Sequence, residues 1–110
     1  MRNIHNLLAK LNITPKYKGY SLIINAVEII LKYTEKDIPF YITKDVYDVL
    51  VEEFDYPLNS VQSAIKRCVE LGWEMEGNTV QKLLGYKAEK CPTNKEFLFA
   101  CAQYLMMKNE

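Results

Sequence analysis

The feature that most constrains this sequence is a pair of amphipathic segments joined by a short turn. Residues Thr43–Phe54 and Asn59–Trp73 both repeat apolar residues every three or four positions, which is typical of helices that bury one face. The connection between them contains Pro57, a residue that interrupts helices. Two short helices joined in this way predict a helix-turn-helix, although any two antiparallel helices of a small α-helical domain would show the same pattern.

The second segment separates two kinds of side chain around its circumference. Its expected buried stripe comprises Val61, Ala64, Ile65, Cys68, Val69 and Trp73. Its expected outer face carries Ser60, Gln62, Ser63, Lys66, Arg67 and Glu70. A helix with an apolar back and a front of hydrogen-bonding and cationic residues suits the recognition helix of a DNA-binding domain.

The composition is that of one globular domain. The chain has 110 residues, of which 49% are hydrophobic, with eight Tyr, four Phe and one Trp. That is enough apolar material for a single core, so we expect residues 1–110 to form one domain. The longest apolar run, Ser21–Leu31, includes Asn25 and Glu28 and is too short to span a bilayer.

The formal net charge is zero, which is unusual for a domain whose affinity would come from phosphate contacts. The charges are unevenly placed along the chain. Residues 1–20 hold four basic residues and no acid, whereas residues 28–55 hold eight acids against three lysines. A basic surface must therefore be assembled locally by the fold.

The residues that commonly build catalytic or metal sites are sparse. There are three Cys and one His, and no pair of cysteines has the Cys-x-x-Cys spacing, so neither a zinc site nor a redox motif is supported. Cys68 and Cys101 fall on apolar helix faces, as expected for buried thiols in a reducing cytoplasm. His5 has no evident partner, and the chain lacks a Gly-rich phosphate loop. We therefore expect no enzyme activity, no metal and no cofactor.

Apolar periodicity predicts an all-α fold of six helices, one of them short. The expected helices are Asn3–Leu11, Lys18 or Gly19 to Tyr33, Thr43–Phe54, Asn59–Trp73, Thr79–Leu84 and Thr93–Met107. The second is apolar around most of its circumference, so it is expected at the centre of the core. The inward-facing residues expected in the third helix are Val46, Val49, Leu50 and Phe54.

Several of these helices begin with residues that favour helix starts. Thr43 is expected to cap the third helix, with Asp45 favourably placed in its first turn. Capping-box pairs are expected at Asn59 with Gln62, Asn78 with Gln81, and Thr93 with Glu96. Gly85 is expected to close the short helix.

A set of motifs spread along the chain carries a family resemblance. These motifs are Lys18-Gly19-Tyr20, Ala64-Ile65-Lys66-Arg67 and Val69-Glu70 before Trp73, Leu84-Gly85-Tyr86, and Pro92-Thr93-Asn94-Lys95-Glu96-Phe97. In their order and spacing the chain resembles, along nearly its full length, the C-terminal DNA-binding domain of the response regulator that initiates sporulation in endospore-forming Firmicutes. The resemblance implies a six-helix domain whose helix-turn-helix binds double-stranded DNA and regulates transcription. It also implies a homodimer on tandem sites, control by a phosphorelay, and contact with RNA polymerase sigma factor.

The resemblance places the family's base-reading positions on the second helix of the pair. The base-reading candidates are Ser60, Gln62, Ser63 and Lys66, to which the cationic front adds Arg67. The best-known family pattern has mostly Arg there, with Glu at the second position, whereas this chain has two Ser, one Gln and one Lys. Each lost bidentate contact should remove about 1–3 kcal/mol of base discrimination, so the target is expected to differ from the family's usual operator. The phosphate-contact candidates are Lys44, Lys87, Lys90 and Lys95.

Other parts of the family pattern are altered. The segment implied to contact sigma factor corresponds to Glu74–Leu84, about one residue shorter here and with different side chains. The family's regulator carries a receiver domain before the effector domain, whereas this chain begins with the effector domain, as a stand-alone copy or an excised piece. Asp45, Asp48 and Glu52 form an acidic stripe on the third expected helix, which faces either solvent or a basic protein partner.

Two functions from different classes remain open at this point. The first is a sequence-specific, double-stranded DNA-binding domain that regulates transcription. The second is a protein-interaction module of the same fold that has lost DNA binding and modulates a full-length regulator. Zero net charge, the two missing arginines and the acidic third helix favour the second, and a coherent basic rim around the recognition helix would favour the first.

Overall fold

The computed structural model describes residues 4–75 and 77–108, and over these ranges the chain is helical with no strand. The elements are α1 (Ile4–Lys10), α2 (Gly19–Glu35), the π-helical segment η1 (Ile42–Tyr47), α3 (Asp48–Phe54), α4 (Leu58–Glu74), α5 (Thr79–Leu84) and α6 (Asn94–Lys108). The prediction of an all-α fold with six helices is confirmed. None of these helices is both long and apolar enough to cross a membrane.

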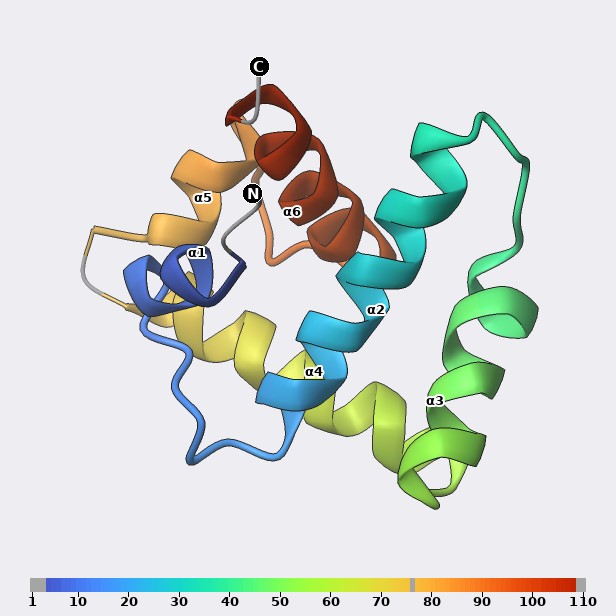
Figure 1. Cartoon of the computed structure of the whole chain (residues 1–110). Coiled ribbons are helices and arrows are strands. Elements are labelled where there is room, and N and C mark those ends of the chain that lie inside the picture. The colour runs from blue at the N-terminus through green and yellow to red at the C-terminus, as the bar shows by residue number, and fades with distance from the viewer. Residues whose placement is uncertain (1–3, 76, 109–110) are drawn as a thin grey trace.

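Helix α2 lies at the centre of the core. Its buried residues spread around most of its circumference, from Leu22 and Ile23 to Ile30, and it packs mainly against α4 and α6. Figure 1 shows α2 crossing the middle of the molecule, with α4 below it and η1 and α3 on one side. The predicted central helix is confirmed, and it ends at Glu35, two residues later than expected.

The turn between α3 and α4 consists of Asp55, Tyr56 and Pro57. Asp55 ends α3 in the left-handed conformation, with φ 57° and ψ 44°, a conformation that Asp tolerates better than most residues. Pro57 then has φ −59°, and α4 begins at the next residue. A three-residue turn between two helices is the connection found in helix-turn-helix units.

Helical structure before this turn begins with a π-helical segment rather than an α-helical one. The buried stripe of η1 and α3 runs through Val46, Tyr47 and Leu50, and Val49 lies outside it. Val46 and Leu50 are buried as expected, whereas the side chain of Val49 is 42% exposed. The prediction that Val49 faces the core was therefore wrong.

Two predicted N-caps were also wrong. The third helical run begins at Ile42, one residue before Thr43, and the Asp45 carboxylate accepts a hydrogen bond from the Tyr41 N–H at 2.8 Å. The N-cap residue of this run is Tyr41, which makes no side-chain cap hydrogen bond. Helix α4 begins at Leu58 directly after Pro57, with no side-chain cap, so Asn59 lies inside the first turn.

The remaining caps are present. The Asn78 side chain accepts a hydrogen bond from the Gln81 N–H at 3.0 Å. The Gln81 side-chain amide forms hydrogen bonds with the backbone of Tyr86 and Ala88 in the next loop, and not with the backbone N–H of Asn78 that a capping box would require. Gly85 closes α5 with φ 76°. The start of α6 has a complete capping box, in which the Glu96 carboxylate accepts from the Thr93 N–H at 2.9 Å and the Thr93 hydroxyl accepts from the Glu96 N–H at 3.1 Å.

This capping box predicts a specific loss of stability in acid. Hydrogen bonds from the Thr93 N–H and hydroxyl hold the pKa of Glu96 below its ordinary value of 4.5. A lowered folded-state pKa contributes stability above the unfolded value, and that contribution disappears as the pH falls through the folded value. We therefore expect the melting temperature of Glu96→Gln to fall less than that of the wild type when the pH is lowered from neutral to about 3. Thermal unfolding across this range tests the prediction, with Glu89→Gln as the matched control, and parallel curves for wild type and Glu96→Gln would contradict it.

Candidate nucleic-acid interface

Helix α4 presents the candidate interface because one of its faces is packed and the other is free. Its buried residues are Val61, Ile65, Cys68, Val69 and Gly72, and Ala64 and Trp73 pack partly against the core. The predicted apolar stripe is confirmed. Because this stripe is anchored to α2, α5 and α6, the opposite face projects from the body of the domain.

The front of α4 is defined here by its exposed polar residues, which are Asn59, Ser63, Lys66, Arg67, Glu70 and Glu74. At about 100° per residue, Ser63 and Glu70 lie near its centre. Ser60 and Gln62 lie on opposite edges of this front, and both are half-buried. Three of the five base-reading candidates therefore point directly outward, and two flank them.

Asn59 is a residue of this front that the sequence analysis assigned to a different role. The helix start at Leu58 releases Asn59 from capping and leaves its side chain exposed in the first turn. Recognition helices contact base edges with the residues near their N-termini, and an Asn carboxamide can bond adenine through two hydrogen bonds. The signal that could have identified Asn59 was Pro57, which can itself precede the first helical residue.

Two lysine-bearing loops flank α4. The first is the segment 85–93, which carries the exposed side chains of Lys87 and Lys90. Burial raises the pKa of the Cys91 thiol, and the nearby carboxylates of Glu70 and Glu74 raise it further while Lys66 lowers it. These interactions show that the loop lies alongside the C-terminal half of α4.

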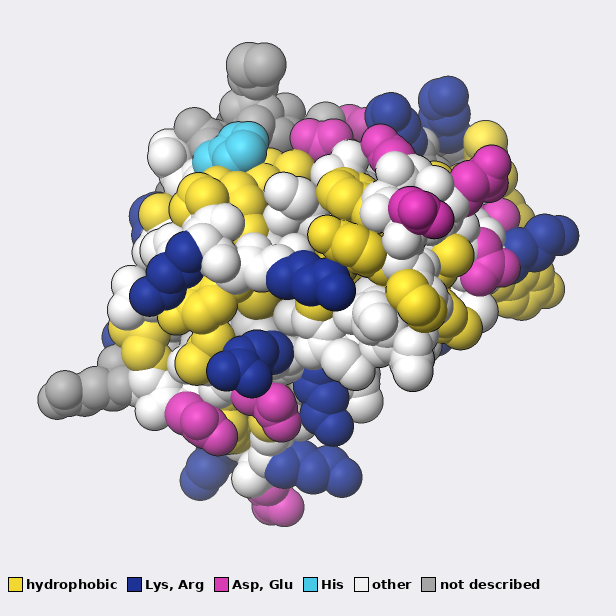
Figure 2. All heavy atoms as spheres, turned by 90° about the horizontal axis from the view of Figure 1, so that it is seen from below, with side chains coloured by type: hydrophobic (Ala, Val, Ile, Leu, Met, Phe, Trp, Pro, Cys, Tyr) yellow, Lys and Arg dark blue, Asp and Glu magenta, His cyan; other side chains and the backbone are white. Residues whose placement is uncertain are grey.

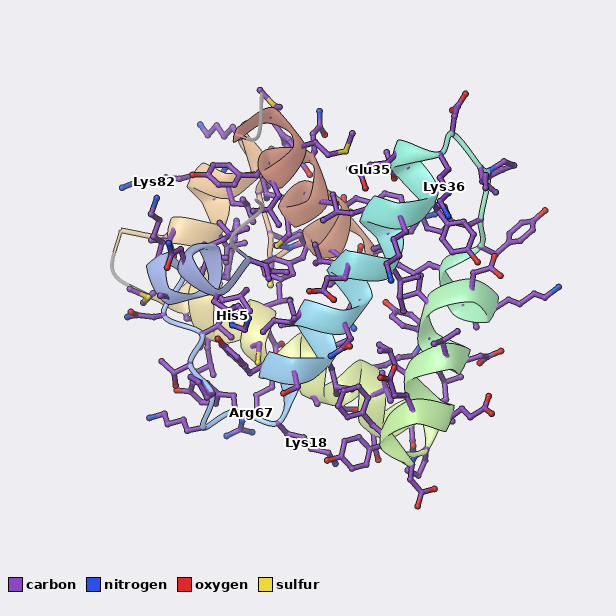
Figure 3. The ribbon with its side chains drawn as sticks, in the orientation of Figure 1. His5, Lys18, Glu35, Lys36, Arg67 and Lys82 are labelled. Carbon is purple, nitrogen blue, oxygen red and sulfur yellow. The ribbon has the colours of Figure 1, made fainter. Side chains whose placement is uncertain are left out.

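The second loop precedes α2 and carries Lys16 and Lys18, which the sequence analysis did not select. The Lys18 ammonium group lies 4.1 Å from the centroid of the Tyr56 ring in the helix-turn-helix turn. Figure 3 shows Lys18 and Arg67 extending from the same lower edge of the domain. The absence of acids from residues 1–20 was the signal that could have identified this loop.

Lys44 and Lys95 lie together in a different place. Both line an open groove of about 750 Å³ that also contains Asp37 and Asp48 but no residue of α4. Lys95 sits 5.7 Å above the centroid of the Phe99 ring in this groove. The structure thus divides the four predicted phosphate contacts into a pair beside α4 and a pair apart from it.

The acidic residues before α4 differ in burial and in hydrogen bonding. Asp45 is half-buried and engaged with the Tyr41 N–H, whereas Asp48, Glu52, Glu53 and Asp55 are exposed. Figure 2 shows Lys and Arg side chains over the central and lower parts of one face, with carboxylates among them, and a further group of carboxylates mixed with Lys or Arg side chains toward the upper right. The basic surface is therefore local and bounded by acids.

The cysteines are packing residues in this arrangement. Cys68 and Cys101 are buried as predicted, and Cys91 is half-buried. Burial raises the pKa of all three thiols, which keeps them protonated at neutral pH. Within residues 4–75 and 77–108, no group of three or more His, Cys, Asp or Glu side chains could hold a metal ion.

Comparison with known proteins identifies the family. The family model described as "Sporulation initiation factor Spo0A C terminal" matches residues 4–105, which include every helix of the fold except the end of α6. No solved structure matches the chain. The chain belongs to the Spo0A C-terminal family, a family of DNA-binding effector domains that regulate transcription in sporulation.

Proposed function

We propose that this chain binds double-stranded DNA in a sequence-specific manner by placing the front of α4 in the major groove. The observation that carries the proposal is the exposure of Ser63, Lys66 and Arg67 on a helix whose opposite face is buried. Lys66 and Arg67 can donate to the guanine edge, and Ser63 can bond any base through its hydroxyl. Asn59 and Gln62 add carboxamides that suit adenine.

Phosphate contacts are proposed on both sides of α4. Lys18 lies beside the helix-turn-helix turn, and Lys87 and Lys90 lie in the loop along the C-terminal half of α4. Lys44 and Lys95 are proposed to contribute less, because the groove that they line contains no residue of α4.

Selection of binders from random duplex DNA tests the proposal directly. We expect an enriched motif in which guanine and adenine occupy positions facing α4, and an affinity that falls as salt rises. Failure to enrich any motif, together with an affinity that does not depend on salt, would overturn it.

The phosphate contacts give a separate, quantitative prediction. Each lost contact should reduce the slope of log affinity against log salt by about 0.9, so Lys18→Gln and Lys90→Gln should each lower it by about that amount. Lys36→Gln is the matched control, because Lys36 follows α2 at the end opposite Lys18, as Figure 3 shows. Equal slopes for Lys18→Gln and Lys36→Gln would contradict the placement of DNA beside Lys18.

A second candidate function rests on a different surface. Ile38, Tyr41 and Phe99 are 47%, 77% and 37% exposed, and all three line the groove that holds Lys44 and Lys95. Exposed apolar residues rimmed by charges are typical of protein-binding surfaces. Sedimentation of the Tyr41→Ser variant with and without DNA tests the groove as a protein-binding surface, and unchanged assembly in both conditions would count against this role.

By the family resemblance we also propose homodimerisation on DNA and contact of residues 74–84 with RNA polymerase sigma factor.

A further inference from the structure

Helix α4 is held by close contacts on both sides of its buried stripe. On one side, a Cβ atom added to Gly19 would lie 2.4 Å from the Ala64 carbonyl oxygen and 2.7 Å from the Cys68 sulfur, so the start of α2 touches α4 directly. On the other side, the Asn94 side-chain amide donates a hydrogen bond to the Gln62 carbonyl oxygen at 2.9 Å.

Asn94 is itself fixed from several directions. It is the first residue of α6, and the Thr93–Glu96 capping box holds the backbone around it. Its side chain also shares a hydrogen bond with Tyr47, a residue of η1 that is 5% exposed. One carboxamide therefore connects α6, the first part of the helix-turn-helix and the recognition helix.

The bond to Gln62 is not required for α4 to be helical. In an α-helix that carbonyl oxygen already accepts from the backbone N–H four residues later. The bond from Asn94 instead adds a fixed point outside the helix. With the close contact at Gly19 on the opposite flank, it can oppose rotation of α4 about its own axis.

The orientation of α4 about its axis decides which bases its front can reach. Side chains extend about 5–6 Å from a helix axis, so a rotation of about 20° displaces their ends by about 2 Å. Binding constellations need positions held to about 0.5 Å and 10–20°. A small rotation would therefore break the hydrogen bonds of Ser63, Lys66 and Arg67 to base edges, while flexible lysines could still follow the phosphates.

We propose that Asn94 is a positioning residue for DNA recognition, which fixes the rotation of α4 through the Gln62 carbonyl oxygen. It contacts no base, and its effect is on specificity rather than on general affinity for DNA. The inference rests on the proposed function and adds to it a residue from outside the helix-turn-helix.

Three variants of the full chain separate the contributions of this carboxamide. Asn94→Ala removes both side-chain bonds, and Asn94→Asp keeps the shape but cannot donate to Gln62. Tyr47→Phe removes the hydroxyl and leaves the Asn94–Gln62 bond. The quantity to measure is the ratio of affinities for the selected site and for an unrelated duplex of equal length.

We expect Asn94→Ala and Asn94→Asp to lower this ratio about tenfold or more, the equivalent of one lost base contact. For Asn94→Ala, affinity for the unrelated duplex should change by less than about twofold, because the phosphate contacts remain. Asn94→Asp also adds a negative charge that lowers affinity for both duplexes, so only its ratio is compared. Tyr47→Phe should retain the ratio. Asn78→Ala, which loses the α5 cap, is a control for the stability cost of removing an Asn hydrogen bond and should also retain it.

A second measurement does not depend on DNA. Backbone amide chemical shifts of free Asn94→Asp should change along both flanks of α4, including residues far from Asn94 in the helix, whereas a local effect would stop within about one turn. Local shifts and an unchanged affinity ratio would overturn the inference and leave the proposed function intact. A wild-type chain with no preference for any duplex would overturn the proposed function, and the chemical shifts would still test the positioning of α4.

Discussion

Ser63→Arg is expected to create a strong preference for guanine opposite the middle of α4. Ser63 is exposed near the centre of the front, and an arginine there could donate two hydrogen bonds to the O6 and N7 atoms of guanine. The gain in discrimination should be about 1–3 kcal/mol, or about 5- to 150-fold. Adding Ser60→Arg, at the half-buried edge of the front, should bring the preference closer to that of a family member with arginine at both positions.

The measurement is the base preference at each position of the bound duplex, compared between wild type, Ser63→Arg and the double variant. Gln103→Arg is the matched control, because it adds the same charge at an exposed position of α6. An arginine that only adds charge should raise affinity for all duplexes equally. Equal effects of Ser63→Arg and Gln103→Arg would show that the front of α4 does not read bases.

Phe97→Ala is expected to destabilise the domain by about 3–5 kcal/mol. Phe97 is the largest side chain that the fold buries completely, and its removal leaves a cavity that the surrounding helices cannot fill. Domains of this size are commonly stable by about 5–15 kcal/mol, so the variant should unfold at a much lower urea concentration. Equilibrium urea unfolding measures the difference.

Phe99→Ala is the matched control for this prediction. It makes the same chemical change two residues later on α6, where the ring is 37% exposed and lines the open groove. We expect a clearly smaller loss of stability, because less apolar surface is removed from the core. Equal losses at the two positions would contradict the described orientation of α6.

The parts of the fold that the sequence predicted are those set by local chemistry. The bounds of α5 matched the prediction because Asn78 and Gly85 define its two ends within a few residues. The capping box of α6 was also recognisable, because Thr93 and Glu96 bond to each other. The start of the third helical run was not predictable in this way, since a π-helical first turn without a side-chain cap leaves no distinct pattern.

The candidate site was predicted in part, again where a local sequence pattern determines the structure. Helical periodicity alone placed Ser63, Lys66 and Arg67 on the exposed face of α4. The approach of Lys18 to Tyr56 and the bond from Asn94 to Gln62 join residues far apart in the chain. Such contacts depend on how the helices pack, and a single sequence carries no pattern that encodes them.

The charge distribution explains how a neutral chain can bind DNA. The carboxylates of Asp48, Glu52 and Glu53 are exposed on α3, and the lysines beside α4 lie on two flanking loops. A duplex centred on Ser63, Lys66 and Arg67 would meet these lysines, with Glu70 and Glu74 farther along the same helix, whereas a duplex displaced toward α3 would meet the acids of α3. Electrostatics therefore favours one docking position although the net charge is zero.

The recognition role of α4 is tested most directly by titrating the isotopically labelled chain with its selected duplex and following its backbone amides by NMR. The largest shift changes are expected in residues 58–67 of α4, with smaller changes in residues 16–19 and 86–90. Changes confined to the groove around Tyr41 and Phe99, with α4 unaffected, would contradict the assignment of α4 as the recognition helix.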